Sequence, residues 1–135
     1  MRSWERAIQP RLPWFRLEFV ERDPAAPVQV HWLRRVAKGR AGFGEMDYQL
    51  TSGSYRVLGK MEVSTTPGLE ERLTVDELRL VIAHEFGHVL GLGHCLDCNS
   101  AMNYSWQTRG RVFVTETDVA TFLALVAKPN GSHPP

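Results

Sequence analysis

Features that are missing from the sequence exclude several classes of protein. It has no apolar run of the roughly 20 residues needed to span a bilayer. It has no excess of one charge, since 16 Lys and Arg face 15 Asp and Glu, which argues against a nucleic-acid or membrane-surface function. It has only two cysteines, so no four-cysteine metal site can form within it.

The first residues also lack the apolar segment of a secretory signal. Either the chain is not exported by that route, or it is a piece of a longer precursor. Hydrophobic content of 43% and charged content of 23% are ordinary for a globular protein. With 135 residues and no internal repeat, the chain is expected to form one domain.

Alternation of apolar and polar residues and the position of turn residues predict several strands. The strands are expected over residues 15–20, 28–33, 45–50 and 55–64, with residues 38–44 forming a loop.

Helices are expected in three places. A short one covers residues 4–8 and ends before the prolines that follow. Thr74 with Glu77 forms a capping box at the start of a second helix. Thr115 caps a last helix that runs to about Ala127, before Pro129.

The second helix contains the most specific pattern in the chain, H-E-x-x-H-x-x-G-x-x-H, formed by His84, Glu85, His88, Gly91 and His94. A chance match has a probability of about one in 10^5 at ordinary residue frequencies. Residues four apart share one helix face, so both imidazoles can reach one metal. Glycine permits the sharp turn that ends the helix and returns a third histidine. Three protein ligands leave one position of a tetrahedral zinc ion open for water, as in catalytic sites.

Glu85 lies next to a ligand and is predicted to act as general base and acid instead of binding metal. A zinc-activated water attacking a carbonyl would give metal-assisted hydrolysis of an acyl bond, most simply a peptide bond. The pattern therefore predicts one catalytic Zn²⁺ held by His84, His88 and His94.

These residues resemble the metzincin clan of zinc endopeptidases. Met102, in Ser100-Ala101-Met102-Asn103-Tyr104, stands where the clan has a methionine turn beneath the metal, and would support the site without being a ligand. Residues 79–94 are most similar to the active-site helix of the matrixins, including their small prokaryotic relatives, and residues 112–119 resemble the start of that family's last helix.

The resemblance implies an α+β, zincin-like fold in which a twisted mixed sheet packs on the active-site helix, followed by the methionine turn and a C-terminal helix. It implies a single catalytic domain over residues 1–128, with an upper subdomain over residues 1–94, a lower subdomain over residues 95–128, and a mobile tail over residues 129–135. Family members place a strand and most of a helix before the point where this chain begins. A truncated domain, a shortened relative and a partner-dependent fragment are all compatible with that difference, and a piece of a secreted precursor would be usual in the family.

Some residues depart from the matrixin pattern. Tyr104 occupies a position at which astacins have a tyrosine that contacts zinc, so it is either a fifth contact and oxyanion stabiliser or an ordinary packed side chain. Cys95 and Cys98 resemble archaemetzincins at this point. They could form a disulfide across the loop, remain free thiols, or supply half of a metal site.

The resemblance also implies a protein or peptide substrate that lies extended along an edge strand, for which residues 43–50 are the candidate. Val81, Tyr104 and Trp106 are expected to line the substrate cleft. The leading hypothesis is a monomeric zinc endopeptidase without nucleic-acid or membrane partners. The alternatives are a zinc-binding homologue without turnover that serves as a binding module, and a zinc hydrolase of small amides or peptidoglycan peptides.

Overall fold

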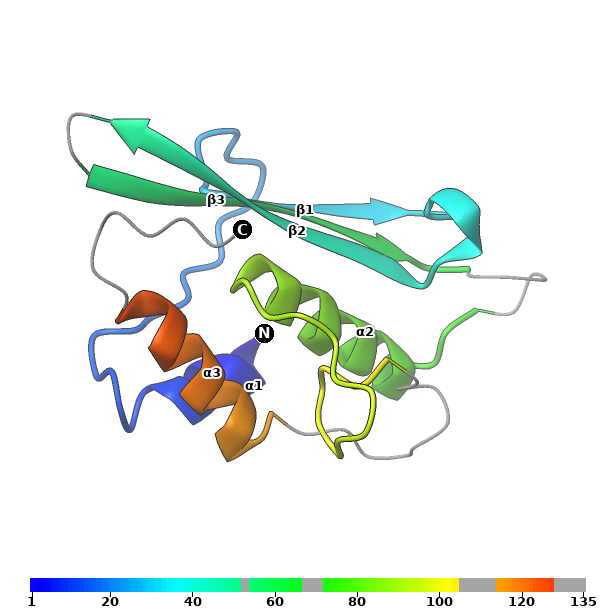
Figure 1. The fold of residues 1–135 in the computed structure, drawn as a ribbon. Coiled ribbons are helices and arrows are strands. Elements are labelled where there is room, and N and C mark those ends of the chain that lie inside the picture. The colour runs from blue at the N-terminus through cyan, green and yellow to red at the C-terminus, as the bar shows by residue number, and fades with distance from the viewer. Residues whose placement is uncertain (52–53, 67–71, 105–113, 128–135) are drawn as a thin grey trace.

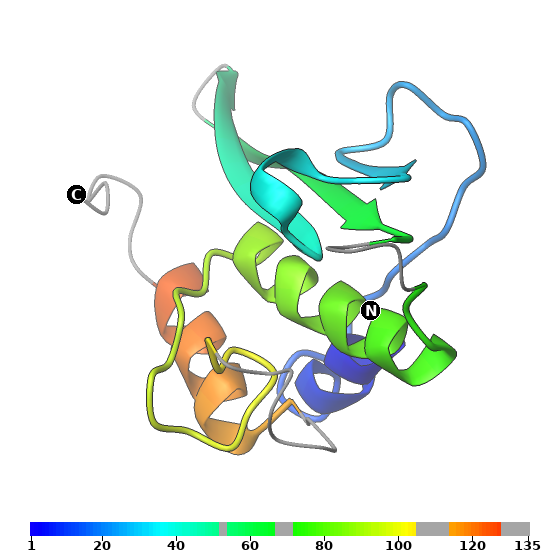
Figure 2. The ribbon, with the colours of Figure 1, turned by 90° about the vertical axis from the view of Figure 1, so that its right-hand side faces the viewer.

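Three layers are stacked in the computed structural model, which describes residues 1–51, 54–66, 72–104 and 114–127 (Figure 1). The uppermost layer is a sheet of strands β1 (Val28–Leu33), β2 (Gly42–Thr51) and β3 (Ser54–Ser64). Helix α2 (Val75–Val89) lies under the sheet. Helices α1 (Arg2–Ile8) and α3 (Glu116–Val126) form the lowest layer, on the far side of α2 (Figures 1 and 2).

The sheet is mixed, with strand order β1-β3-β2. Strand β1 pairs with β3 in parallel, from Val28 opposite Gly59 to Leu33 opposite Ser64. Strand β2 pairs with β3 in antiparallel fashion, from Gly42 opposite Val63 to Thr51 opposite Ser54. In the described portion of the chain, β2 is therefore an edge strand. A short 3-10 turn (Ala37–Gly39) lies between β1 and β2.

The hydrophobic core fills both faces of α2. Strand β3 covers the upper face, while α1, α3 and the segment around Met102 cover the lower face. Burial of these side chains supplies the main driving force that holds the layers together. The principal members are Trp4, Ile8, Met61, Val63, Val81, Phe86, Val89, Met102, Val119 and Phe122.

Trp4 joins the lowest layer to α2. Its side chain is completely buried, and its indole N–H donates a hydrogen bond of 2.7 Å to the carbonyl oxygen of Ala83 in α2. Phe15, just after α1, packs edge-on against Phe122 of α3 with 5.8 Å between ring centroids. The first contact holds α1 against α2, and the second joins α3 to the segment that follows α1.

The α+β prediction, with a mixed sheet on the helix that contains the histidine pattern, is confirmed. The strand over 28–33 and the three helices are also confirmed within a few residues. The predicted loop over 38–44 is wrong in its second half, because β2 already begins at Gly42.

The strand predicted over residues 15–20 is wrong, and side chains of α1 and the residue after it explain why. Leu17 N–H donates to Glu5 Oε1 at 3.0 Å, and Gln9 and Arg2 donate to the carbonyls of Phe15 and Leu17 at 3.1 Å. Backbone groups that a neighbouring strand would satisfy are bonded to these side chains instead. The apolar and polar alternation reflects half-buried Phe15 and Leu17 facing the core, not a strand in a sheet.

Among the described helices, none combines the length and apolar character needed to cross a membrane. Trp106, the predicted tail over 129–135 and most of the segment before the last helix lie outside the described residues.

Candidate metal and catalytic site

Helix α2 fixes two of the three histidines. Its predicted capping box is present: Thr74 N–H donates to Glu77 Oε2 at 2.7 Å, and Glu77 N–H donates to Thr74 Oγ1 at 3.3 Å. This box satisfies backbone donors that a helix start otherwise leaves free. His84 and His88 follow on one face of the same helix, with ring centroids 4.8 Å apart.

A glycine turn returns the third histidine to the same place. Gly91 has a φ of +88°, a conformation that favours glycine. Leu92 N–H donates to the carbonyl of Gly87 at 3.0 Å, which closes the helix end. The His94 ring then lies 4.6 Å from that of His88 and 5.0 Å from that of His84, between centroids.

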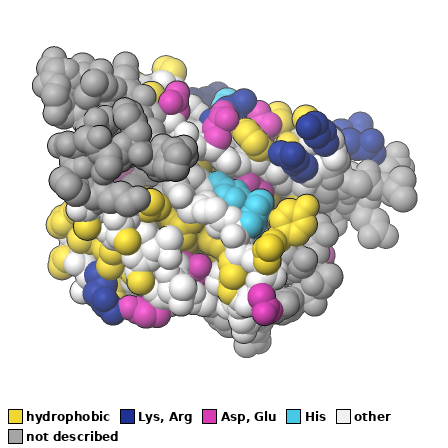
Figure 3. Space-filling model, viewed as in Figure 1, with side chains coloured by type: hydrophobic (Ala, Val, Ile, Leu, Met, Phe, Trp, Pro, Cys, Tyr) yellow, Lys and Arg dark blue, Asp and Glu magenta, His cyan; other side chains and the backbone are white. Residues whose placement is uncertain are grey.

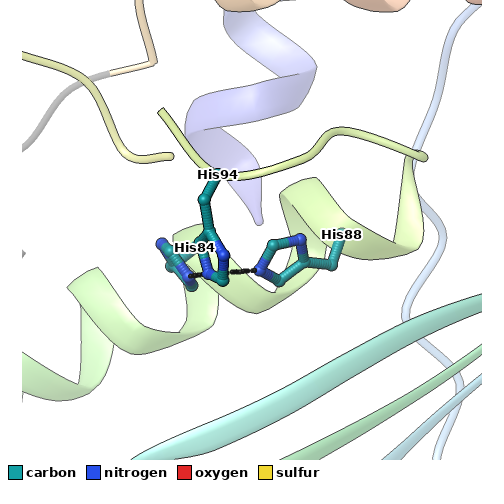
Figure 4. A group of neighbouring side chains, drawn as sticks. All are labelled: His84, His88 and His94. Atoms are coloured by element: carbon teal, nitrogen blue, oxygen red, sulfur yellow. Dashed lines mark hydrogen bonds between the residues drawn. The ribbon is translucent and has the colours of Figure 1, made fainter. Parts of the chain in front are cut away.

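The three histidines point their Nε2 atoms at one another (Figure 4). The Nε2 atoms of His84 and His88 are 3.2 Å apart, and each is 3.1 Å from Nε2 of His94. Tetrahedral coordination at the usual zinc–nitrogen distance places ligand nitrogens about 3.3 Å apart. The spacing of the three nitrogens therefore fits a single zinc ion.

The outer nitrogens show which atoms are free to bind metal. Nδ1 of His84 is 2.7 Å from the carbonyl oxygen of Ala101, and Nδ1 of His88 is 2.8 Å from that of Leu92. A carbonyl only accepts, so both Nδ1 atoms carry the proton and both Nε2 atoms carry lone pairs. Two lone pairs facing each other at 3.2 Å repel unless a cation lies between them. Both the spacing of the Nε2 atoms and their free lone pairs therefore fit a bound metal ion.

Burial keeps His84 neutral. Loss of hydration lowers its pKa to about 4. The hydrogen bond to Ala101 raises this pKa, while the nearby His88 and His94 lower it further. The pKa of His94 is also lowered, by burial and then by His88. Since metal ligation requires the neutral ring, these two histidines are ready to bind at neutral pH.

Glu85 lies beside the histidines, under strand β2, and is 7% exposed. A methyl group added at Gly44 would lie 2.2 Å from the backbone oxygen of Glu85, and one at Gly42 would lie 2.5 Å from its Cγ. The strand approaches the helix this closely because both positions are glycine. Burial raises the pKa of Glu85 to about 7, while the charge of Arg40 and a hydrogen bond from the Gly44 N–H oppose that rise.

A cavity of about 560 Å³ opens over the histidines. Histidine side chains are visible at the surface on this face of the molecule (Figure 3). One wall is the start of β2 with the residues before it, and the other is α2 with the loop beyond it. The lining residues are Arg40, Ala41, Gly42, Phe43, Gly44, His84, Glu85, His88, His94 and Tyr104.

The floor below the histidines is built around Met102. This side chain is 1% exposed, and a methyl group at Gly87 of α2 would lie 2.1 Å from its sulfur. Cys95 N–H donates to the carbonyl of Met102 at 2.8 Å, which ties the floor to the residue after His94. Ser100 Oγ accepts from Met102 N–H at 2.9 Å and donates to Asp118 Oδ1 at 3.0 Å, which ties the floor to α3.

The other residues predicted for the site do not all reach the cavity. Tyr104 lines the cavity, is 66% exposed, and meets the His94 ring edge-on at 5.1 Å between centroids. Val81 is fully buried beneath Gly42 and is not brought into the cavity. Cys95 and Cys98 form a disulfide, which selects the loop cross-link among the three alternatives.

Four residues important to the site did not emerge from the sequence. Gly42 and Gly44 fall in the predicted loop. Two glycines two residues apart, followed by an alternating polar and apolar stretch, could have indicated a strand that packs closely against a helix. Arg40 carries no sequence signal, since an arginine in a basic loop is common. Asp118 could have been found from its position three residues after Thr115, which is the spacing of a capping box.

Comparison with known proteins gives one match. A family model described as Matrixin matches residues 2–126, nearly the whole chain. No curated protein and no solved structure matches the chain.

Proposed function

The chain belongs to the matrixin family, and from this premise we propose that it is a zinc-dependent endopeptidase with Glu85 as its general base and acid. Family membership and the three-histidine site support a zinc metallopeptidase in general terms. The observation that carries the finer proposal is the convergence of three Nε2 atoms beside a buried carboxylate in one open cavity.

His84, His88 and His94 would hold the ion, and the carbonyls of Ala101 and Leu92 orient the first two rings. When bound, zinc supplies a Lewis acid that polarises a substrate carbonyl and makes water a better nucleophile at neutral pH. The open side of the histidine cluster faces the cavity, where a substrate carbonyl has access.

Glu85 is suited to move a proton. Its carboxyl group lines the cavity with the histidines, and burial raises its pKa above the ordinary value, which helps it to take up a proton. We expect it to take a proton from the attacking water and pass it to the amine that leaves.

The substrate is proposed to lie along β2. This strand is an edge strand in the described sheet, and its first residues form one wall of the cavity. An extended peptide can pair with such an edge through its backbone, almost independently of its sequence. This arrangement favours a peptide bond over a small amide as the bond that is cut.

Tyr104 is proposed to stabilise the oxyanion. Its exposed ring stands at the cavity beside His94, where a phenolic O–H could donate to a reacting oxygen. In Tyr104→Phe we expect slower cleavage at unchanged metal content. A loss of metal would instead make Tyr104 a fifth ligand.

The test is cleavage of a quenched-peptide library by the zinc-loaded chain, with and without a chelator. We expect cleavage that the chelator abolishes and zinc restores. Glu85→Gln should keep its zinc and lose at least about 100-fold in rate, the usual contribution of a general base. Full cleavage by this variant would refute the role of Glu85.

The same experiment separates the alternatives. A folded, zinc-loaded chain that binds peptides without cutting them would be a binding module. Cleavage confined to small amides or peptidoglycan peptides would identify the other class of zinc hydrolase.

A further inference from the structure

Arg40 is the one permanent cation among the described residues that line the cavity, and Glu85 is the one carboxylate. Arg40 lies just before β2, so it stands at the entrance of the wall along which the substrate is proposed to lie. Its side chain is exposed, and within the described portion of the chain it forms none of the ion pairs. The guanidinium is therefore available to a ligand.

Further basic residues lie close to it in the chain. Arg34, Arg35 and Lys38 are exposed and belong to the same connection between β1 and β2. Figure 3 shows Lys and Arg side chains gathered next to the histidines on the face that holds the cavity. The net charge of the chain is only +1, so this concentration of positive charge is local. Such a local field attracts anionic ligands to the cleft.

A carboxylate is the ligand that fits. A guanidinium matches a carboxylate with two parallel hydrogen bonds, which a lysine cannot do. The alternative is that Arg40 serves Glu85, whose pKa its charge lowers. Among the described ion pairs, none joins the two residues directly. Arg40 thus retains its capacity to bind a second carboxylate.

Resting on the proposed peptidase function, we propose that Arg40 is a specificity-determining residue that binds a substrate carboxylate, so that the cleft prefers acidic peptides. The carboxylate comes either from an Asp or Glu side chain near the cut bond or from the free C-terminus of a short peptide.

The test uses matched peptides that differ only in Glu or Gln at one position within about three residues of the cut bond, all with amidated C-termini. A second set keeps Gln and carries a free C-terminus, which distinguishes the two sources of carboxylate. For the native chain, kcat/KM should be about three- to fivefold higher for the acidic peptide, the effect of one exposed ion pair. The preference should shrink when salt is raised from about 0.1 M to about 1 M.

Two variants test whether the preference for acidic peptides comes from Arg40. Arg40→Gln should bring the acidic-to-neutral ratio close to one, and Arg40→Lys should restore it in part. Lys38→Gln is the matched control, because it removes one charge from the same connection but is not among the lining residues. It should leave most of the ratio intact. Equal ratios in the native chain and Arg40→Gln would overturn the proposal, as would an equal loss on both peptides, which would assign Arg40 to Glu85.

A binding measurement separates this proposal from the peptidase function. Fluorescence anisotropy of the labelled peptides with the chelator-treated chain should show the same preference for Glu without any cleavage. Preferential binding without turnover of the zinc-loaded chain would retain the role of Arg40 and refute the peptidase. Cleavage of both peptides without preference, in rate and in binding, would refute the role of Arg40 and retain the peptidase.

Discussion

At the scale of single residues, the site depends as much on side chains that are absent as on those that act. Gly42 and Gly44 let β2 lie against α2 at Glu85, and Gly87 leaves room for the sulfur of Met102. The side chain of Glu85, the proposed general base, therefore lies in the narrow space between its own helix and strand β2. Its burial and its raised pKa both follow from this close approach.

Gly44→Ala tests that arrangement. The new methyl group would collide with the backbone oxygen of Glu85, which no rotamer change can relieve. We expect a loss of about 2 kcal/mol in the free energy of unfolding, as for overpacked cores, together with a loss of peptide cleavage. Denaturant titration and kcat/KM measure the two effects.

Gly93→Ala is the matched control, because a methyl group there meets no atom within 4 Å, although the position is next to His94. It should change stability by less than about 0.5 kcal/mol. If Gly44→Ala behaved like Gly93→Ala, the close contact between strand and helix would be wrong.

At the scale of elements, the helices were predictable because their signals are local. Both capping boxes are formed by residues three apart, and the histidine spacing has meaning only on a helix. The strands were less predictable because their partners are distant. Residues 15–20 alternate like a strand, but side chains of α1 and Gln9 occupy their backbone groups. Likewise, the approach of β2 to Glu85 depends on packing between segments about 40 residues apart.

The capping box of α2 should make this helix sensitive to acid. Hydrogen bonds from Thr74 lower the pKa of Glu77 below its ordinary value of 4.5. The ionised form thus stabilises the fold above that value, and this stability is lost as pH falls below it. Glu77→Gln should therefore unfold at lower temperature near neutral pH and approach the native chain as pH falls. Thermal unfolding between about pH 7 and pH 3 measures the difference.

Glu18→Gln serves as the control, since Glu18 is an exposed residue outside the helices. The gap between its melting temperature and that of the native chain should stay small throughout this range. A gap for Glu77→Gln that does not narrow in acid would show that the box does not stabilise the helix through the charge of Glu77.

At the scale of the whole molecule, the N-terminal segment helps to support the site. Trp4 reaches α2 at Ala83, next to His84, and its indole N–H is bonded there. The lowest layer thus holds the helix from below while β2 covers it from above.

Trp4→Phe removes the indole donor and some of the buried volume. We expect a loss of about 2 kcal/mol or more in the free energy of unfolding, from the hydrogen bond and the cavity together. Trp14→Phe is the control, because Trp14 is 73% exposed, and it should have little effect. Similar denaturation midpoints for the two variants would contradict the anchoring role of Trp4.

The carboxylate of Asp118 serves two regions of the molecule at once. One oxygen accepts from Thr115 at the start of α3, and the other accepts from Ser100, which in turn holds Met102. Unravelling the first turn of α3 would withdraw the acceptor that fixes Ser100. We therefore expect the last helix and the floor of the cleft to open together, so that fraying of the first turn of α3 also exposes Ser100 and Met102 to water.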